Sequence, residues 1–154
     1  MRAVLSLGLG LLALAGCQAA SAPSSPDDYS AEESILSLEV GWCLNDIDQP
    51  IAQEMTDVPT VSCDEPHQSE VYAEILVDEA SFPGIDAVVD FAAEQCTQAF
   101  ESFIGLPYVD SELSFHYYDP TANSWAVGDR SVFCVAYDPA GDTVGSLSEA
   151  LRYF

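Results

Sequence analysis

Basic residues are nearly absent from this chain of 154 residues, which has no lysine and only three arginines, at positions 2, 130 and 152. They face 26 acidic residues, so the formal net charge is −23. Proteins that bind nucleic acids neutralise phosphates with Lys and Arg, so the composition excludes a nucleic-acid partner. The same composition disfavours binding to anionic lipid headgroups. A cationic partner, a domain held off a membrane and adaptation to a salty medium are all compatible with this charge.

The apolar run at the N-terminus is too short to span a bilayer as a helix. It covers the 13 residues Ala3–Ala15 behind Arg2, which is typical of the apolar region of a signal peptide. The small residues Ala15 and Gly16 followed by Cys17 resemble the bacterial lipobox. We therefore predict a signal peptide over residues 1–16 and acyl chains on Cys17, which anchor the protein at the extracytoplasmic face of the cell membrane. A secreted protein without an anchor is the alternative.

Familiar catalytic and metal-binding patterns are also missing. The chain has neither a G-x-S-x-G elbow nor the D-x-[DN]-x-[DN]-G pattern of a calcium loop. Cys63 and His67, with the carboxylates of Asp64, Glu65 and Glu70 nearby, are the densest group of possible zinc ligands. No second C-x-x-C or H-x-x-x-H accompanies them. We therefore predict no enzymatic activity, no cofactor and no metal site.

Five cysteines are present, and four remain once Cys17 is assigned to the lipid. An even number of cysteines in an exported protein is typical of disulfide bonds. Two bridges are expected among Cys43, Cys63, Cys96 and Cys134, and their spacing leaves all three pairings open.

The chain after the signal peptide divides into a tether and one domain. Residues 17–34 are first rich in Pro and Ser and then acidic, without hydrophobic periodicity, so we predict a lipidated flexible acidic tether. Residues 35–154 form the domain. The 49% hydrophobic content of the chain excludes a disordered protein.

Residue periodicity predicts the secondary structure. Apolar residues recur at three- and four-residue steps over Ile85–Ile104, between Pro83-Gly84 and Gly105, which predicts an amphipathic helix with Cys96 on its buried face. Period-two alternation predicts strands at 70–77, 112–118 and 131–137, shorter strands at 38–44 and 58–63, and a loop at 119–128. The simplest arrangement of these elements is an α+β domain: an antiparallel sheet with one long amphipathic helix packed on a face, and two disulfides.

Arg130 stands directly before the last predicted strand. In so acidic a chain, we expect it to form a bidentate pair with Glu70, Asp64 or Asp129, which would lock its loop to the turn at residues 63–67. The alternative is that Arg130 binds a ligand.

The motifs Cys63-Asp64-x-Pro66-His67-x-x-Glu70 and Trp125-x-x-Gly128-Asp129-Arg130-x-x-x-Cys134 occur in order, with Pro83-Gly84 between them and Gly145-Ser146-Leu147 after them. This series, from about residue 41 to residue 147, resembles the septum formation domain of actinobacteria. The resemblance implies a link to cell division, an actinobacterial source and the disulfide pairs Cys43–Cys63 and Cys96–Cys134. It implies no catalytic residue. The candidate interaction or structural residues are Asp64, Pro66, His67, Glu70, Trp125, Gly128, Asp129 and Arg130.

These observations favour a non-enzymatic, surface-anchored interaction domain whose partner is an envelope or divisome protein. The runner-up is an extracytoplasmic lipoprotein that captures a cation, a peptide or a cell-wall fragment, and an uncharacterised hydrolase is third. A deep pocket holding Arg130 and His67 would favour the runner-up. A flat surface with both side chains paired internally would favour the interaction domain.

Overall fold

The computed structural model describes residues 32–47 and 57–153. The strands pair antiparallel throughout, in the order β1-β3-β2-β4-β6-β5, and two disulfides are present, so this part of the predicted fold is confirmed. No helix in the described ranges is both long and apolar enough to cross a membrane. The elements in chain order are β1 (Glu32–Ser34), the 3-10 helix η2 (Ile35–Ser37), β2 (Cys43–Leu44), β3 (Asp57–Val61), β4 (Ser69–Leu76), α1 (Ile85–Ile104), the 3-10 helix η3 (Tyr108–Asp110), β5 (Ser114–Tyr118), α2 (Ala122–Ala126) and β6 (Ser131–Tyr137).

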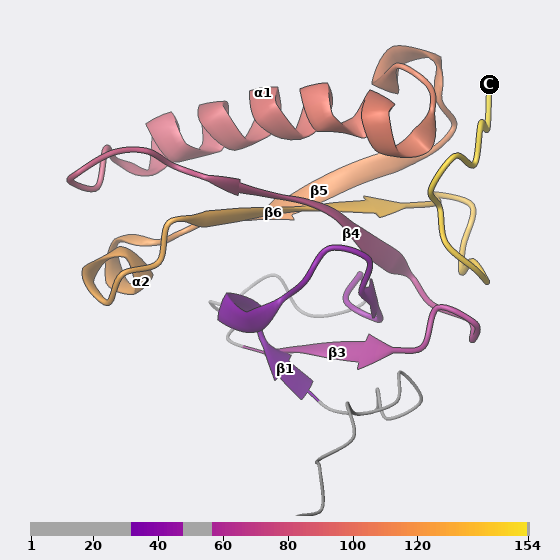
Figure 1. Cartoon of the computed structure of the whole chain (residues 1–154), viewed down its shortest axis with the longest axis horizontal. Coiled ribbons are helices and arrows are strands. Elements are labelled where there is room, and N and C mark those ends of the chain that lie inside the picture. The colour runs from indigo at the N-terminus through magenta and orange to yellow at the C-terminus, as the bar shows by residue number, and fades with distance from the viewer. Residues whose placement is uncertain (1–31, 48–56, 154) are drawn as a thin grey trace, which may run out of the picture.

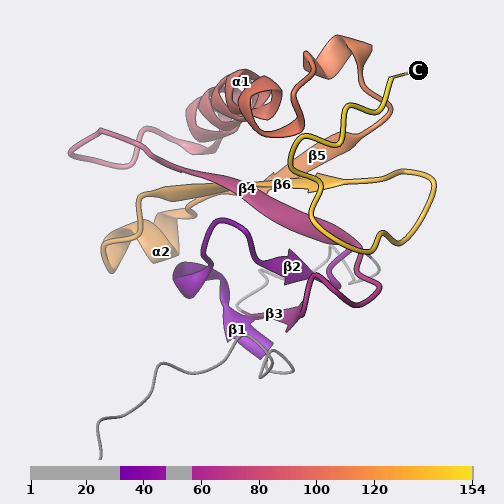
Figure 2. The same cartoon turned by 45° about the vertical axis from the view of Figure 1, so that its right-hand side comes forward.

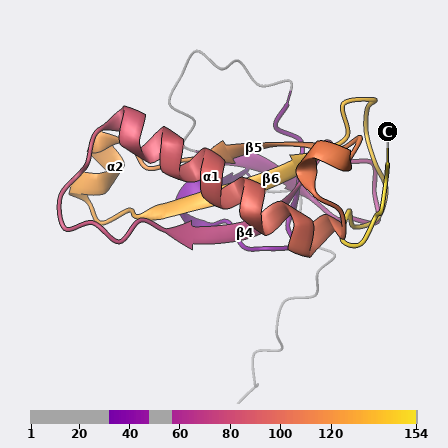
Figure 3. The ribbon, with the colours of Figure 1, turned by 90° about the horizontal axis from the view of Figure 1, so that it is seen from above.

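The long strands β4, β6 and β5 form the middle layer of the molecule. Helix α1 covers one face of this layer, and β1, β2 and β3 lie on the other side (Figures 1 and 2). Seen from above, α1 runs across β4 and β6 (Figure 3). The middle layer is therefore covered on both faces, and the apolar side chains form one core on each side of it.

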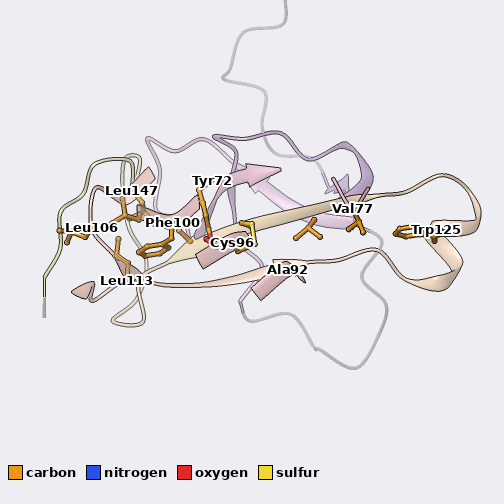
Figure 4. Close-up of a cluster of buried hydrophobic side chains, with 13 residues drawn as sticks. Tyr72, Val77, Ala92, Cys96, Phe100, Leu106, Leu113, Trp125 and Leu147 are labelled. Atoms are coloured by element: carbon orange, nitrogen blue, oxygen red, sulfur yellow. A yellow bond between two sulfur atoms is a disulfide. The ribbon is translucent and has the colours of Figure 1, made fainter. Parts of the chain in front are cut away.

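The first core lies between α1 and the middle layer. Helix α1 has the predicted bounds and ends at Gly105, whose φ of 83° is the left-handed conformation that favours glycine at a helix end. The side chains that it buries are Val88, Ala92, Cys96, Phe100 and Ile104. Cys96 is bonded to Cys134 of β6, the pairing that the resemblance implies, so a covalent bond joins helix and sheet (Figure 4).

The second core lies under the middle layer, and β6 contributes to both. Val132, Cys134 and Ala136 belong to the core beside α1. Phe133 and Val135 pack in the second core. Successive residues of β6 thus face opposite cores, in agreement with the period-two alternation predicted for residues 131–137. The other members of the second core are Leu38, Leu44, Val58 and Val71.

A β-bulge in β4 breaks the period-two alternation predicted for that strand. The pairing with β6 skips one residue between Val71 and Ala73, so that Tyr72 has no directly opposite partner. Val71 therefore packs in the second core, whereas Tyr72 and Ala73 both face α1. The Tyr72 hydroxyl donates a hydrogen bond to the carbonyl oxygen of Cys96 at 2.8 Å.

Several predicted boundaries are also wrong. Residues 32–34, predicted to belong to the tether, form β1 because β3 pairs with them, although the segment has no period-two pattern of its own. The strand predicted over residues 38–44 is reduced to Cys43–Leu44. The predicted loop 119–128 contains α2, whose start is capped by reciprocal hydrogen bonds between Thr121 and Ser124. A helix of five residues is too short for helical periodicity to identify.

The C-terminal segment, residues 143–151, forms hydrogen bonds with two other parts of the fold. His67 and Thr143 exchange backbone hydrogen bonds of 2.9 and 2.8 Å. Farther along, the Glu149 N–H donates to the carbonyl of Phe103 at 2.7 Å and the Leu151 N–H to that of Ile104 at 3.2 Å. The last turn of a helix leaves carbonyls without partners inside the helix. The C-terminal segment supplies donors for two of them.

Candidate functional site

The candidate residues lie at opposite ends of the β4–β6 pair. The antiparallel register places Glu70 opposite Ala136 and Leu76 opposite Ser131. Six residues of strand at about 3.3 Å each separate the two ends by about 20 Å. We call residues 63–70 with 143–147 the histidine end, and residues 76–77 with 125–131 the arginine end.

His67 is fully buried at the histidine end. Its Nδ1 atom lies 2.9 Å from the carbonyl oxygen of Glu65, and its Nε2 atom lies 3.1 Å from the Thr143 hydroxyl. Cys63 is bonded to Cys43, the pairing that the resemblance implies. Cys63 and His67, the sulfur and nitrogen donors of the possible zinc site, therefore already have partners within the fold. Asp64 and Pro66 lie exposed on its surface.

Glu70 is also buried, with 2% of its surface exposed. Its carboxylate accepts hydrogen bonds from the Ser146 hydroxyl at 2.8 Å and from the Leu147 N–H at 2.6 Å. Burial raises the pKa of Glu70 above its ordinary value, and the opposing effects of these donors and of His67 do not cancel the increase. Glu70 thus fastens the C-terminal segment to β4.

A buried polar cluster around Asp46 is absent from the sequence-based candidates. The Asp46 carboxylate accepts hydrogen bonds from the hydroxyls of Ser69 and Tyr118, each at 2.5 Å, and lies 2.9 Å from Nε2 of His116. Burial raises the pKa of Asp46, but the hydrogen bonds and charge of His116, with the hydroxyl donors, outweigh burial and lower it. The cluster connects the end of β2 to β5. Because 70 residues separate Asp46 from His116, no local pattern reveals it.

At the arginine end, Trp125 and Arg130 form a stack. The Trp125 ring is buried against Phe82, with ring centroids 5.5 Å apart, and the Arg130 guanidinium lies 3.7 Å from the centre of the Trp125 ring. Nη1 of Arg130 donates to the carbonyl oxygens of Trp125 at 2.9 Å and Asp129 at 2.5 Å. Gly128, with φ of 106°, permits the tight turn between these residues. Stacking and hydrogen bonds thus hold the guanidinium in one orientation.

The predicted pairing of Arg130 with a carboxylate is wrong. Its backbone carbonyl pairs with Val77 at the arginine end, whereas Glu70 and Asp64 lie at the other end of the strands. The Asp129 carboxylate accepts from the Ser131 N–H instead. By contrast, Arg152 forms ion pairs with Asp138 and Glu112. Among the described residues, Arg130 is therefore the only arginine without a carboxylate partner.

A surface groove runs beside Arg130. Its volume is about 490 Å³, and its apolar wall consists of Leu36, Leu76 and Val127, which are 56%, 64% and 80% exposed. Residues 128–131 complete the lining. The groove brings Gly128, Asp129 and Arg130 together with the end of β4 and with η2. It does not include His67, which lies at the other end of the β4–β6 pair.

Comparison with known proteins relates the chain to a described family. A family model described as septum formation matches residues 28–134. No curated protein and no solved structure matches the chain. Cys17, the predicted lipid attachment site, lies outside the described residues.

Proposed function

We propose that this chain, which belongs to the septum formation family, is a non-enzymatic interaction domain of the cell envelope. Membership of that family suggests a role related to cell division. In this proposal, acyl chains on Cys17 anchor it at the extracytoplasmic face of the membrane. The domain then binds an envelope or divisome protein and links that protein to the site of septum formation.

The groove at the arginine end is the main observation that supports the proposed protein interaction. Three aliphatic side chains stand more than half exposed around one cavity. Neighbouring apolar side chains that remain exposed in a folded protein often mark an interaction site. In a chain with 26 acidic residues, an aliphatic wall of this kind is suited to a protein partner.

The state of the reactive side chains supports a non-enzymatic role. The four cysteines of the domain form disulfides, and both histidines have hydrogen-bond partners within the fold. The buried Ser69 hydroxyl donates to the carboxylate of Asp46, whereas the base that activates a serine nucleophile is usually an imidazole. These groups stabilise the fold, and the family is not a known enzyme family.

The alternative is a lipoprotein that captures a small ligand. The specific observation in its favour is Arg130, whose charge has no carboxylate partner among the described residues. That observation favours a ligand with an anionic group, such as a peptide or a cell-wall fragment, over a cation.

Localisation tests the proposed interaction. A fluorescent fusion of the full chain should be enriched at septa in its own cells, and Val127→Ser should reduce that enrichment. Val109→Ser is the matched control, because Val109 lies in η3 outside the groove and is 79% exposed, against 80% for Val127. A uniform peripheral signal from the unaltered protein would contradict the proposed role at septa.

Fractionation tests the proposed anchor. A Cys17→Ser variant should leave the membrane fraction or retain its signal peptide. A variant that is cleaved and still bound to the membrane would contradict attachment through Cys17.

A further inference from the structure

We propose that the groove at the arginine end binds the free carboxyl terminus of a basic envelope protein, with Arg130 holding the terminal carboxylate and the aliphatic wall receiving the last side chains. This inference rests on the proposed interaction function and specifies the partner's chemistry. Four features support it: the charge of Arg130, its fixed orientation, the shape of the groove and the acidity of the remaining surface.

Arg130 offers an unused edge for a carboxylate. A guanidinium has five N–H donors, and the two on Nη1 of Arg130 bind the carbonyl oxygens of Trp125 and Asp129. The donors on Nε and Nη2 have no hydrogen-bond partner among the described residues. These two nitrogens lie along one edge of the planar group and match the two oxygens of a carboxylate. A terminal carboxylate therefore completes the hydrogen bonding of this side chain.

The fold fixes this edge before any ligand arrives. The Trp125 ring supports one face of the guanidinium, and the two carbonyl oxygens restrict rotation about the side chain. Binding loses less conformational entropy when a receptor side chain is already held in its bound orientation. Arg130 is thus a preorganised anion receptor, unlike Arg152, whose guanidinium is already paired with Asp138 and Glu112.

The groove has the size and lining for a chain terminus. Its volume of about 490 Å³ falls within the range of small-ligand sites, about 300–1,000 Å³. A few extended residues fill such a space. Leu36, Leu76 and Val127 stand around the space. An aliphatic side chain next to the terminal carboxylate would cover their exposed surface and gain from its removal from water.

The charge of the surrounding surface specifies the rest of the partner. With a net charge of −23, the chain repels an acidic protein and attracts a basic one. Near the groove, Ser131 donates a hydrogen bond to the carboxylate of Glu74, which leaves negative charge beside the site. Basic residues upstream of the terminus would therefore steer the partner, while Arg130 selects its carboxylate.

A pair of peptides separates these two electrostatic effects. The probe is an acetylated pentapeptide of two lysines followed by alanine, valine and leucine, prepared with a free carboxyl end and with an amidated end. The amide has the larger positive charge, so attraction to the acidic surface alone favours the amide. We expect the free acid to bind the full chain more tightly by about tenfold or more, because only the acid forms charge-assisted bonds with Arg130.

Fluorescence of Trp125 reports the binding, with Trp42→Phe as the background that removes the other tryptophan. Arg130→Gln should abolish the preference for the acid, and Arg130→Lys should retain only part of it, since an ammonium lacks the planar fork. Val127→Ser should weaken binding of the acid several-fold, whereas Val109→Ser should not. Melting curves of each variant identify any that fails to fold.

Equal binding of the two peptides, or tighter binding of the amide, would overturn the inference. Loss of the preference in Arg130→Gln together with unweakened binding of the acid to Val127→Ser would overturn the assignment to the groove wall. The proposed function fails differently. If septal enrichment depends on Val127 but the carboxylate preference is missing, the interaction role stands and only the chemistry assigned to the partner is wrong.

Discussion

The two ends of the β4–β6 pair use ionisable side chains in opposite ways. At the histidine end, His67 and Glu70 are buried, and both hydrogen-bond to the C-terminal segment. At the arginine end, Arg130 is held only by backbone carbonyls and by the Trp125 ring, and it lines a groove. The same strands thus carry a structural polar site at one end and a charge available to a partner at the other. In a chain with 26 acidic residues, an arginine without a carboxylate partner is therefore better evidence of a binding site than a buried ionisable side chain that is already paired.

Removal of the Cys43–Cys63 disulfide should be the most destabilising change at the histidine end. The bond joins residues 20 positions apart, and loop closure of that length contributes about 3 kcal/mol in the chain-entropy model. Replacement of both cysteines by alanine should lower the free energy of unfolding by that amount in urea titrations. A loss well under 1 kcal/mol would show that the histidine end does not depend on this bond.

Glu70→Ala should cost about 2–3 kcal/mol of unfolding free energy, because the Leu147 N–H and the Ser146 hydroxyl lose a charged acceptor in a buried site. Hydrogen exchange should show faster opening of residues 143–147. Ser114→Ala on β5, at the opposite edge of the middle layer, is a control for the general effect of a strand substitution. An unchanged exchange rate at residue 147 would contradict the fastening role of Glu70.

Asp46→Asn should cost about 2 kcal/mol at neutral pH and alter the acid limb of the stability curve. The pKa of Asp46 is lowered in the fold, so its stabilisation is present above its ordinary value of 3.8 and is lost as the pH falls through the folded-state pKa. The contribution of Glu70 to stability changes with pH in the opposite direction. Its raised pKa adds stability below its ordinary value of 4.5, which is lost as the pH rises through the folded-state pKa.

Urea titrations of the unaltered protein and of Asp46→Asn from pH 7 to pH 2 measure the contribution of Asp46. The unaltered protein should lose stability below pH 3.8 more steeply than Asp46→Asn. Parallel curves for the two proteins would show that Asp46 titrates alike in the folded and unfolded states.

Arg130→Ala should have the smallest effect, about 1 kcal/mol or less, from loss of the stack on Trp125 and of two bonds to carbonyls. The comparison of the two ends depends on this result. If Arg130→Ala destabilises as much as Glu70→Ala, the arginine end is structural as well, and the groove loses its assigned receptor.

The elements that the sequence predicts well are those with long, regular periodicity. The helix over Ile85–Ile104 and the strand over Ser131–Tyr137 have the expected bounds, because one apolar stripe and one strict alternation extend over their whole length. The bulge at Tyr72 breaks such an alternation without any change in residue type. Its position depends on pairing with β6, which local sequence does not encode.

The candidate site was only partly predictable for a similar reason. Sequence analysis selects Trp125, Gly128, Asp129 and Arg130 as a group, and the structure places them at one turn. The expected pairing of Arg130 with Glu70, Asp64 or Asp129 failed, because Glu70 and Asp64 lie at the other end of the strands and Asp129 accepts from the Ser131 N–H. The register of β4 and β6 decides that distance. Leu36 and Leu76 join the groove from distant parts of the chain, so exposed apolar residues at 36 and 76 carry no local sign of it.

The position of the C-terminal segment bears on how the domain can be produced and dissected. A fragment that stopped at Cys134, where the matched region ends, would cut β6 before its last three residues. It would also lack Thr143, Leu147 and the donors that cap α1. We expect such a fragment to be degraded or aggregated on expression, although it contains all four cysteines of the domain. Deletion mapping of partner binding should therefore retain the chain through at least residue 151.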